Sequence, residues 1–380
     1  MVNLSELIDF KTYQYNWDAI HSVPEFAILE SCEQSKKWHG EGNVWEHTKK
    51  VCEYASDFAG KLHSIGFSDS DVKIFLTSAL FHDIGKGVTT KKGKDNDWHS
   101  YGHEVEGEKI TRYLLWNEGY AFREKVCAMV RWHMEPLEIL SKKNALGFIA
   151  DLSNVIPSWN LLIHLKICDI LGSNPSDESE RVKSQTKLFG LTSVVKAMNC
   201  ADGPSDVALK SSYDFKYLDY PDDKRIYAVV MIGLPGAGKS TYMSKFRDSV
   251  IVSRDIIRAE LGYCKEGEKV VCTAEQEENV TKAFNEKMLK AAKEKKTIVI
   301  DNINLKKKYR DAYKEVLKDY SVLWEYVYIE APSISDNLKR REGQISEDVF
   351  KNMIYSFDWP YPTEYSFVEY HISDDEKDEA

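Results

Sequence analysis

Apolar residues in the first half of the chain recur every three to four positions, which is typical of helices that bury one face. The pattern extends over five segments that we expect to be helices, namely 44–66, 72–85, 105–119, 122–134 and 159–172. Several of these segments end in Gly, a residue that commonly stops a helix. Residues 1–190 are therefore predicted to form an all-helical domain.

The pattern changes after about residue 225, where short apolar runs replace the helical spacing. Such runs lie at 226–233, 297–301 and 324–331, and a helix-like segment, 307–319, separates the last two. Strands that alternate with helices are typical of a parallel sheet covered by helices. Residues 223–380 are therefore predicted to form an α/β domain, and residues 191–222 a linker or bridge.

Composition narrows the classes of protein without naming one. A length of 380 residues fits two or three domains, and a hydrophobic content of 43% excludes a mainly disordered chain. The formal net charge of −10 argues against a strongly cationic coat for nucleic acid, although a local basic groove, for example at 305–310, stays open. Seven unpatterned Cys, with no leader or membrane-spanning apolar stretch in the sequence, predict a cytoplasmic protein without membrane contact.

Histidines and acids in the helical half form the first candidate constellation. They fall on different predicted helices, and a bundle can bring such positions together in its core. Imidazole and carboxylate suit Mn, Fe, Co, Ni or Zn, and adjacent ligands such as His82 and Asp83 include a carboxylate that can bridge two ions. The candidates are His47, His82, Asp83, His103, His133 and Asp169.

The segments WEHTKK, ALFHDIGKG and ICDILG resemble the HD phosphohydrolase superfamily, whose pattern is H…HD…D. The resemblance implies that one metal is bound by His47, His82, Asp83 and Asp169. It also implies a second metal at His103 and His133, with Asp83 as the bridge, and places Lys86 beside the substrate phosphate. For His103 and His133 the alternative is an ordinary hydrogen-bonded histidine, and His39 and His99 are open between the two interpretations.

A phosphate-binding loop is the second candidate constellation. Residues 233–240, GLPGAGKS, follow a predicted strand and precede a helical segment, which is the context that GxxxxGK[ST] requires. Backbone N–H groups would approach the phosphates, Lys239 would bridge the β- and γ-phosphates and Ser240 would hold Mg²⁺. We expect ATP or another NTP, without preference for a base, at Gly233, Pro235, Gly236, Ala237, Gly238, Lys239, Ser240 and Thr241.

Acids and arginines beyond this loop complete a candidate kinase site. Asp255 lies just after the short apolar run at 249–253, where it can act as general base toward a hydroxyl, and Arg258 follows one turn later to bind an acceptor phosphate. Asp301 occupies the place of a second acid on the magnesium side. Arg340 and Arg341 lie on a polar helix that can act as a lid over the transferred phosphate. The alternatives are a helix N-cap for Asp255 and a solvated charged face for the two arginines.

This half resembles the P-loop 5′-hydroxyl polynucleotide kinases in GLPGAGKS, SRDIIR, DNINL and NLKRR. The resemblance implies that Asp255 activates the 5′-OH and that Arg258 contacts the acceptor's scaffold phosphate. It further implies that Arg340 or Arg341 acts on the donor phosphates.

Together the halves resemble the HD-Pnk family of bacterial RNA end-healing enzymes. The resemblance implies removal of a 2′,3′-cyclic phosphate or a 2′/3′-phosphate with two divalent ions (Mn, Co, Ni or Fe), and phosphorylation of a 5′-OH of RNA or DNA, upstream of an RNA ligase. One alternative is a nucleotide-metabolism enzyme that pairs a small-molecule kinase with a nucleotide phosphohydrolase. A non-enzymatic nucleotide sensor is disfavoured because it does not need the acid, the metal ligands and the lid arginines together.

Overall fold

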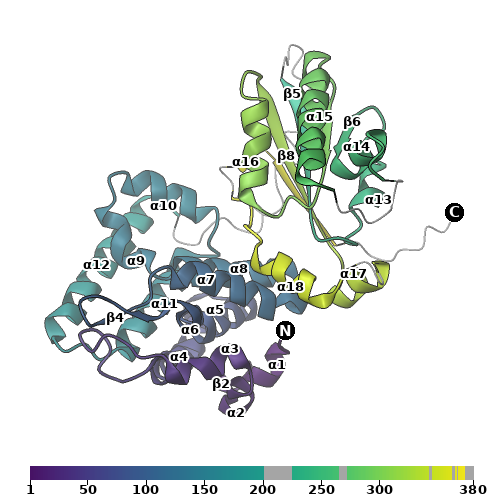
Figure 1. The fold of residues 1–380 in the computed structure, drawn as a ribbon. Coiled ribbons are helices and arrows are strands. Elements are labelled where there is room, and N and C mark those ends of the chain that lie inside the picture. Colours follow the sequence, from purple (N-terminus) through teal and green to yellow (C-terminus); the bar gives the residue numbers. More distant parts are fainter. Residues whose placement is uncertain (201–224, 265–271, 342–344, 362–363, 366, 373–380) are drawn as a thin grey trace. The chain divides into compact units, whose positions relative to one another are not determined.

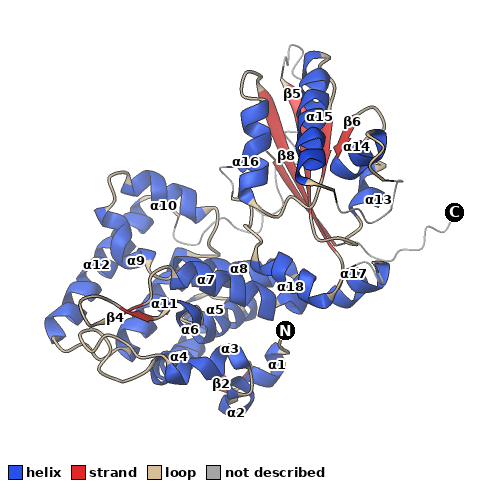
Figure 2. Cartoon of the chain, viewed as in Figure 1, coloured by secondary structure: helices blue, strands red, loops and turns tan. Residues whose placement is uncertain are grey.

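The computed structural model describes residues 1–200, 225–264, 272–341, 345–361, 364–365 and 367–372. The chain divides into two compact units, Met1–Asp206 and Val207–Ala380, each of which is described by itself. Figure 2 shows helices throughout the first unit and the larger sheet in the second. Of the expected linker, residues 191–197 continue a helix, and residues 201–222 lie outside the described residues.

The first unit is helical as predicted, with two short antiparallel strand pairs added to it (Figure 1). Its longer helices are α4 (Val44–Leu62), α5 (Asp69–Phe81), α7 (His103–Leu114), α8 (Tyr120–Trp132), α10 (Ala145–Ser153), α11 (Trp159–Gly172) and α12 (Glu178–Ala197). Its short elements are α1 (Leu4–Leu7), α2 (Trp17–His21), α3 (Pro24–Ala27), α6 (Lys86–Thr89) and α9 (Glu135–Glu138), with β1 (Ile8–Asp9) paired to β2 (Gln14–Tyr15) and β3 (Lys91–Lys92) to β4 (Trp98–His99).

Helix α5 forms the centre of this unit, where it contacts α4, α8 and α11. The helix is apolar almost all round and is buried from Ile74 to Phe81, as expected for a core helix. A capping box fixes its start, because Ser68 and Asp71 exchange hydrogen bonds of 3.0 and 3.2 Å between side chain and backbone. The chain leaves α5 after Phe81, so the next two residues, His82 and Asp83, turn inside the core.

The second unit contains the predicted parallel sheet. The strands β5 (Ile226–Ile232), β6 (Val250–Ser253), β7 (Ile298–Asp301), β8 (Val322–Glu330) and β9 (Phe367–Ile372) run parallel in the order β6-β7-β5-β8-β9. Its helices are α13 (Lys239–Met243), α14 (Arg254–Glu260), α15 (Ala274–Lys293), α16 (Lys307–Val316), α17 (Ile334–Arg340) and α18 (Glu347–Tyr355). Strand β9 was not expected, because this edge strand mixes polar and apolar residues and lacks the continuous apolar run of an inner strand.

Three neighbouring strands bring the candidate kinase residues to one edge of the sheet. β5, β7 and β6 are adjacent, and Ser253 at the end of β6 is in register with Asp301 at the end of β7. Parallel strands end at the same edge, where α/β sheets bind their ligands. The loop after β5, the start of α14 and Asp301 therefore lie together.

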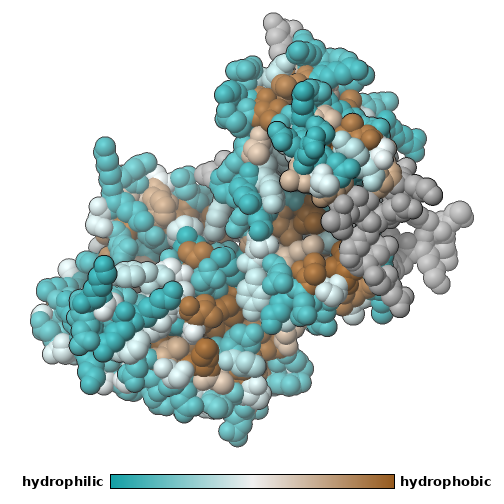
Figure 3. Space-filling view, in the orientation of Figure 1, coloured by the Kyte–Doolittle hydropathy of each residue, from teal (hydrophilic) through white to brown (hydrophobic). Residues whose placement is uncertain are grey.

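Figure 3 shows one face of each unit, on which polar side chains predominate. In the view of Figure 3, hydrophilic side chains cover most of the visible face of the helical unit, and hydrophobic side chains gather in smaller patches between them. No helix among the described residues combines the length and the apolar character that crossing a bilayer demands.

Arg310 lies in the basic segment 305–310 but is fully buried in the structure. Its guanidinium contacts both carboxylate oxygens of Glu364, at 2.9 and 3.1 Å. It also donates to the carbonyl oxygens of Asn304, Leu305 and Asp358 at 2.9 to 3.0 Å. Arg310 is thus a buried residue that links Asn304 and Leu305 to Asp358 and Glu364, and it is not part of a basic surface.

We expect Arg310→Met to lower the free energy of unfolding of this unit by about 3–5 kcal/mol, because it leaves the Glu364 carboxylate buried without its cation. Urea denaturation followed by circular dichroism would measure the change. Lys308→Met, at an exposed position of the same helix, is the matched control and should stay within about 0.5 kcal/mol of the parent. Equal denaturation midpoints for the two variants would show that the buried Arg310–Glu364 ion pair does not stabilise this unit.

Candidate functional site

The six predicted metal ligands come together in the core of the helical unit. His47 comes from α4, His82 and Asp83 from the turn after α5, His103 from the start of α7, His133 from the end of α8 and Asp169 from α11. All six are buried. Two groups of three have their ligand atoms within 4.8 Å of one another, His47–His82–Asp83 and Asp83–His103–His133, so Asp83 belongs to both. Asp169 joins the first group, with Oδ1 3.1 Å from Nε2 of His47.

Three of the histidines are held in one tautomer by the backbone. The Nδ1 atoms of His82, His103 and His133 lie 2.9, 2.8 and 2.7 Å from the carbonyl oxygen three residues earlier. A carbonyl only accepts, so each Nδ1 carries a proton, and Nε2 is the nitrogen that faces the other candidate ligands.

The facing Nε2 atoms need a cation. Nε2 of His103 lies 3.2 Å from Nε2 of His133, and the same atoms of His47 and His82 are 3.4 Å apart. Between the neutral rings of His103 and His133, two nitrogen lone pairs at this distance repel, whereas a divalent ion accepts both. Burial and the neighbouring cations lower the pKa of His103 and of His133, which keeps these rings neutral as metal ligands must be. The donor set therefore fits divalent metal.

Glu41 is a member of this centre that the sequence analysis missed. Its buried Oε1 lies 2.9 Å from Nδ1 of His47 and 2.7 Å from Nδ1 of His39. A carboxylate on Nδ1 leaves Nε2 free to face the centre. Burial opposes the charged ring, but hydrogen bonds with Asp169 and Glu41 raise the pKa of His47 to about 9, so the site favours a positive charge. An acid between two glycines, outside any periodic segment, gives no signal in the sequence.

Two buried lysines keep the acids ionised. Lys86 Nζ lies 2.7 Å from Asp83 Oδ2 and 3.0 Å from Gln34 Oε1, and Lys166 Nζ lies 2.6 Å from Asp169 Oδ2. Burial alone would raise the pKa of each acid, but the lysine beside it holds that pKa well below its usual value. Lys166 was not expected, because it stands among the apolar residues of α11, where a sequence pattern predicts only core.

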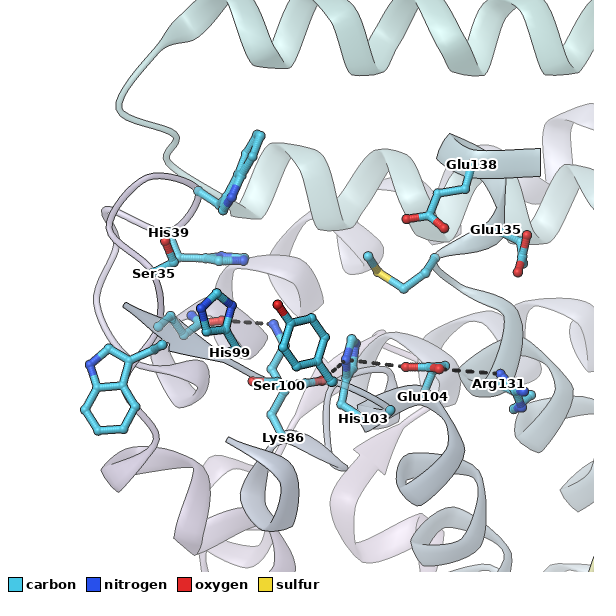
Figure 4. A pocket seen from close by; sticks show the side chains of 16 residues that line it. Ser35, His39, Lys86, His99, Ser100, His103, Glu104, Arg131, Glu135 and Glu138 are labelled. Carbon is cyan, nitrogen blue, oxygen red and sulfur yellow. Dashed lines mark hydrogen bonds and ion pairs between the residues drawn. The ribbon is translucent and has the colours of Figure 1, made fainter. Parts of the chain in front are cut away.

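The metal centre opens into two adjoining pockets of about 430 and 420 Å³, which share His39, Lys86 and His103. Figure 4 shows the first, with His39 and His99 on one side and Glu135 and Glu138 on the other. Lys86 and His39 therefore lie where a substrate would reach the centre.

Gly85 of the HDIGK segment sets how closely two parts of the centre approach. A Cβ there would lie 2.0 Å from the carbonyl oxygen of His103 and 2.5 Å from the amide nitrogen of Gly107. We expect Gly85→Ala to lower the free energy of unfolding by about 1–3 kcal/mol, because α7 must move away. Urea denaturation would measure this. The control is Gly60→Ala, whose Cβ would meet only Tyr13, at 3.9 Å, and equal midpoints would contradict the close approach.

The phosphate-binding loop lies between β5 and α13. Gly238 precedes the helix with φ of +97°, a conformation that L side chains rarely adopt, and Ala237 packs into the core beneath the sheet. Lys239 Nζ donates to the carbonyl oxygens of Gly233 and Leu234 at 2.9 and 3.0 Å. Burial lowers the pKa of Lys239 to about 8, although Asp301 opposes the shift. The structure thus gathers Gly233, Pro235, Gly236, Ala237, Gly238, Lys239, Ser240 and Thr241 in one loop and helix start.

Helix α17, the expected lid, is bound to this loop. Asn337, which is buried, donates from Nδ2 to the carbonyl oxygen of Pro235 at 2.9 Å, and Arg340 donates to that of Gly236 at 3.1 Å. The solvated-face interpretation therefore does not describe Arg340. Arg341 follows at the end of the helix, and its charge acts on both Lys239 and Asp301. Asn337 was missed, since an Asn within a polar helix carries no sequence signal of burial.

The acid and arginine of α14 are paired with each other. Asp255 is 90% exposed, and its Oδ1 lies 2.6 Å from Nη1 of Arg258. The N-cap of α14 is Ser253, so Asp255 is not the cap. Glu277 of α15, which the sequence analysis missed, binds Nε of Arg258 at 2.8 Å and Nη2 of Arg254 at 2.6 Å, and its bond with Arg258 chiefly lowers its pKa, to about 2. Arg258 is thus held on both sides.

Comparison with known proteins assigns both units. Residues 44–172 match the HD domain family and residues 229–360 match the AAA domain family. A protein of Autographa californica nuclear polyhedrosis virus, described as a bifunctional polynucleotide kinase/RNA ligase, is 26% identical over 147 residues, which are 37% of this chain and 19% of the viral protein.

Solved structures give weaker matches. A chain of the Pnkp1/Rnl/Hen1 complex is 16% identical, with 40% of this chain and 48% of that chain covered at a TM-score of 0.30. Kti12 of Chaetomium thermophilum is 15% identical, with 40% and 91% covered at a TM-score of 0.29. The chain therefore spans about a fifth of the viral relative and about half of the chain from the complex.

The two family matches agree with the geometry of the two sites. They imply a nucleotide with Mg²⁺ in the second unit and a divalent metal in the first, where the histidines and acids cluster. The chain therefore joins an N-terminal HD domain to a C-terminal P-loop kinase domain of the AAA family.

Proposed function

We propose that this protein heals broken RNA ends. The HD site removes a 2′,3′-cyclic phosphate or a 2′/3′-phosphate with two divalent ions drawn from Mn, Co, Ni or Fe. The P-loop site transfers the γ-phosphate of an NTP to a 5′-OH. The products, a 3′-hydroxyl and a 5′-phosphate, are the ends that an RNA ligase joins, so the protein acts before a ligase.

In the HD site the chain's own residues would position and neutralise the phosphate. His47, His82, Asp83 and Asp169 would hold one ion, and Asp83, His103 and His133 a second; such ions polarise a phosphate and supply hydroxide at neutral pH. Lys86 lies beside Asp83 and lines both pockets, so its ammonium faces the place where the phosphate would sit. His39 lines the same openings and would contact the leaving sugar oxygen or the phosphate.

In the kinase site each group has a position that suits one task. The loop amides and Lys239 would hold the β- and γ-phosphates, and Ser240 would bind Mg²⁺. Asp255, exposed at the strand edge, would accept the proton of the acceptor hydroxyl. Arg258 would bind the acceptor's phosphate, and Arg340 or Arg341 would offset the charge on the transferred group.

One observation supports this proposal: a buried cluster of histidines and acids that fits divalent ions and a GxxxxGK[ST] loop that fits a phosphate donor stand in one chain. Phosphate removal and phosphate addition are opposite reactions, and a single substrate needs both where it carries the phosphate at the wrong end. RNA cleaved by transesterification is such a substrate, with a 2′,3′-cyclic phosphate and a 5′-OH. The viral relative, whose description names polynucleotide kinase activity, supports the same interpretation.

An end-labelled oligonucleotide assay tests the proposal. RNA with a 5′-OH and a 2′,3′-cyclic phosphate is incubated with the protein, with and without ATP, and with Mg, Mn, Co, Ni or Fe ions. Phosphate should appear at the 5′ end only when ATP is present. The phosphate at the 3′ end should be removed in the absence of ATP. Free nucleosides are the comparison: phosphorylation of nucleosides in preference to 5′-OH RNA would overturn the proposal in favour of nucleotide metabolism.

A further inference from the structure

The second pocket of the HD unit runs along helix α12 and carries cations that the chemistry at the metal centre does not use. Its outer wall includes Lys183, Ser184 and Lys187, with Glu180 at the same face. These positions are spaced by three, one and three residues, so they form one stripe of the helix. Arg181, beside the stripe, also lines the pocket.

Buried residues on the adjoining face of α12 hold the stripe in place. Leu188, Leu191 and Val195 are buried, and the helix packs against α9 and α11. Lys183 is 62% exposed and lies 2.8 Å from Glu180, so its ammonium stays at the rim of the pocket. The lysines at 183 and 187 are one helical turn apart, about 6 Å along the axis, which is close to the spacing of successive phosphates in a single strand.

The first pocket has a different character. Tyr101 is 83% exposed, yet its ring is held flat on that of His99, with centroids 5.1 Å apart and planes within 7°. Trp98 lines the same pocket and Trp38 lines both pockets, so an aromatic base would find stacking partners there. Glu104 and Glu135 line this pocket and not the second, and they would repel a phosphate backbone here, whereas Glu138 lines both pockets (Figure 4).

From these two pockets we propose that the HD site binds the end of a polynucleotide strand. The last base lies against Tyr101 in the first pocket, and the preceding backbone phosphates lie along Lys183 and Lys187 in the second. The inference rests on the proposed function, in which the substrate is an RNA end, and adds the residues along which the strand reaches the site. A mononucleotide reaches the metal centre and the first pocket but leaves the α12 stripe without a ligand. The stripe therefore contributes only when further phosphates precede the reacting end.

The test compares two substrates, adenosine 2′,3′-cyclic phosphate and a short RNA that ends in the same group, in the metal-loaded full-length protein. For Lys183→Ala/Lys187→Ala, kcat/KM on the RNA should fall about tenfold or more, with kcat/KM on the mononucleotide within twofold. The dependence of log kcat/KM for the RNA on log salt should become shallower by about 0.7 for each lysine removed. Lys196→Ala, an exposed lysine of the same helix outside the pocket, is the control and should leave both substrates unchanged.

Tyr101→Ala tests base stacking in the first pocket independently of phosphate binding along α12, because the terminal base is present in both substrates. It should reduce kcat/KM about tenfold on each. Equal loss on both substrates for the double lysine variant, or no loss on either, overturns the α12 path. If the parent hydrolyses neither substrate with any of the metals, the proposed function fails; anisotropy of a fluorescent RNA then decides the path alone, since weaker binding by the double variant supports it and equal binding overturns it.

Discussion

Asp83→Asn should reduce hydrolysis of a 3′-terminal phosphate at least about 1,000-fold, which corresponds to about 4 kcal/mol of transition-state stabilisation. Asp83 is the one residue shared by both groups of candidate ligands, so its loss removes a ligand from each. The amide has the shape of the carboxylate but not its charge, and it leaves the ammonium of Lys86, 2.7 Å away, without an anion. Release of phosphate from an end-labelled RNA would measure the effect.

Two controls make this prediction specific. The P-loop activity of the same variant should stay within about twofold of the parent, because its residues belong to a separate unit. Asp151→Asn, at an exposed acid of α10, should hydrolyse the RNA at the parental rate. If Asp83→Asn keeps more than a tenth of the phosphatase activity while it binds metal normally, Asp83 does not bridge two ions.

Asp255→Asn should lower kcat for 5′ phosphorylation by about 10²- to 10⁴-fold, the usual contribution of a positioned general base. The amide still accepts a hydrogen bond from Arg258, so the arginine pair with Glu277 should persist and KM for ATP should change little. Transfer of labelled γ-phosphate to a 5′-OH oligonucleotide would measure kcat. Phosphatase activity of the same variant is the internal reference and should be unchanged.

Glu260→Gln is the matched control for Asp255, since it alters an exposed acid at the far end of the same helix. We expect parental kinase activity from it. Retention of kinase activity by Asp255→Asn would remove Asp255 from the role of base and would direct attention to Asp301, whose pKa burial raises above its usual value.

The fold was predictable because its signals are local and repeated. The five expected helices of the first half and the parallel strands of the second follow from spacing and from short apolar runs, and both are found. Strand β9 was not predictable, because its place at the sheet edge depends on pairing with β8 and not on its own composition. Arg310 shows the same limit: a charged residue in a basic run is ordinarily solvated, and only the distant Glu364 makes it a core residue.

The candidate site divides in a similar way. The structure brings together the residues that the sequence predicted as metal or phosphate ligands, because chemistry fixes their types and motifs fix their spacing. The residues that hold them in place, Glu41, Lys166, Asn337 and Glu277, were missed. Each acts through one or two partners whose positions are known only after folding, so neither periodicity nor composition marks it.

The backbone hydrogen bonds of His82, His103 and His133 have a consequence for which metal the HD site would bind. These bonds leave Nε2 of each ring as the nitrogen available to a metal, and imidazole together with carboxylate suits several first-row metals. Occupancy of the site would then depend on the supply of each metal and on its intrinsic affinity, which rises in the order Mn, Fe, Co, Ni. Preparations grown in media of different trace-element content should therefore differ in specific activity although their polypeptides are identical.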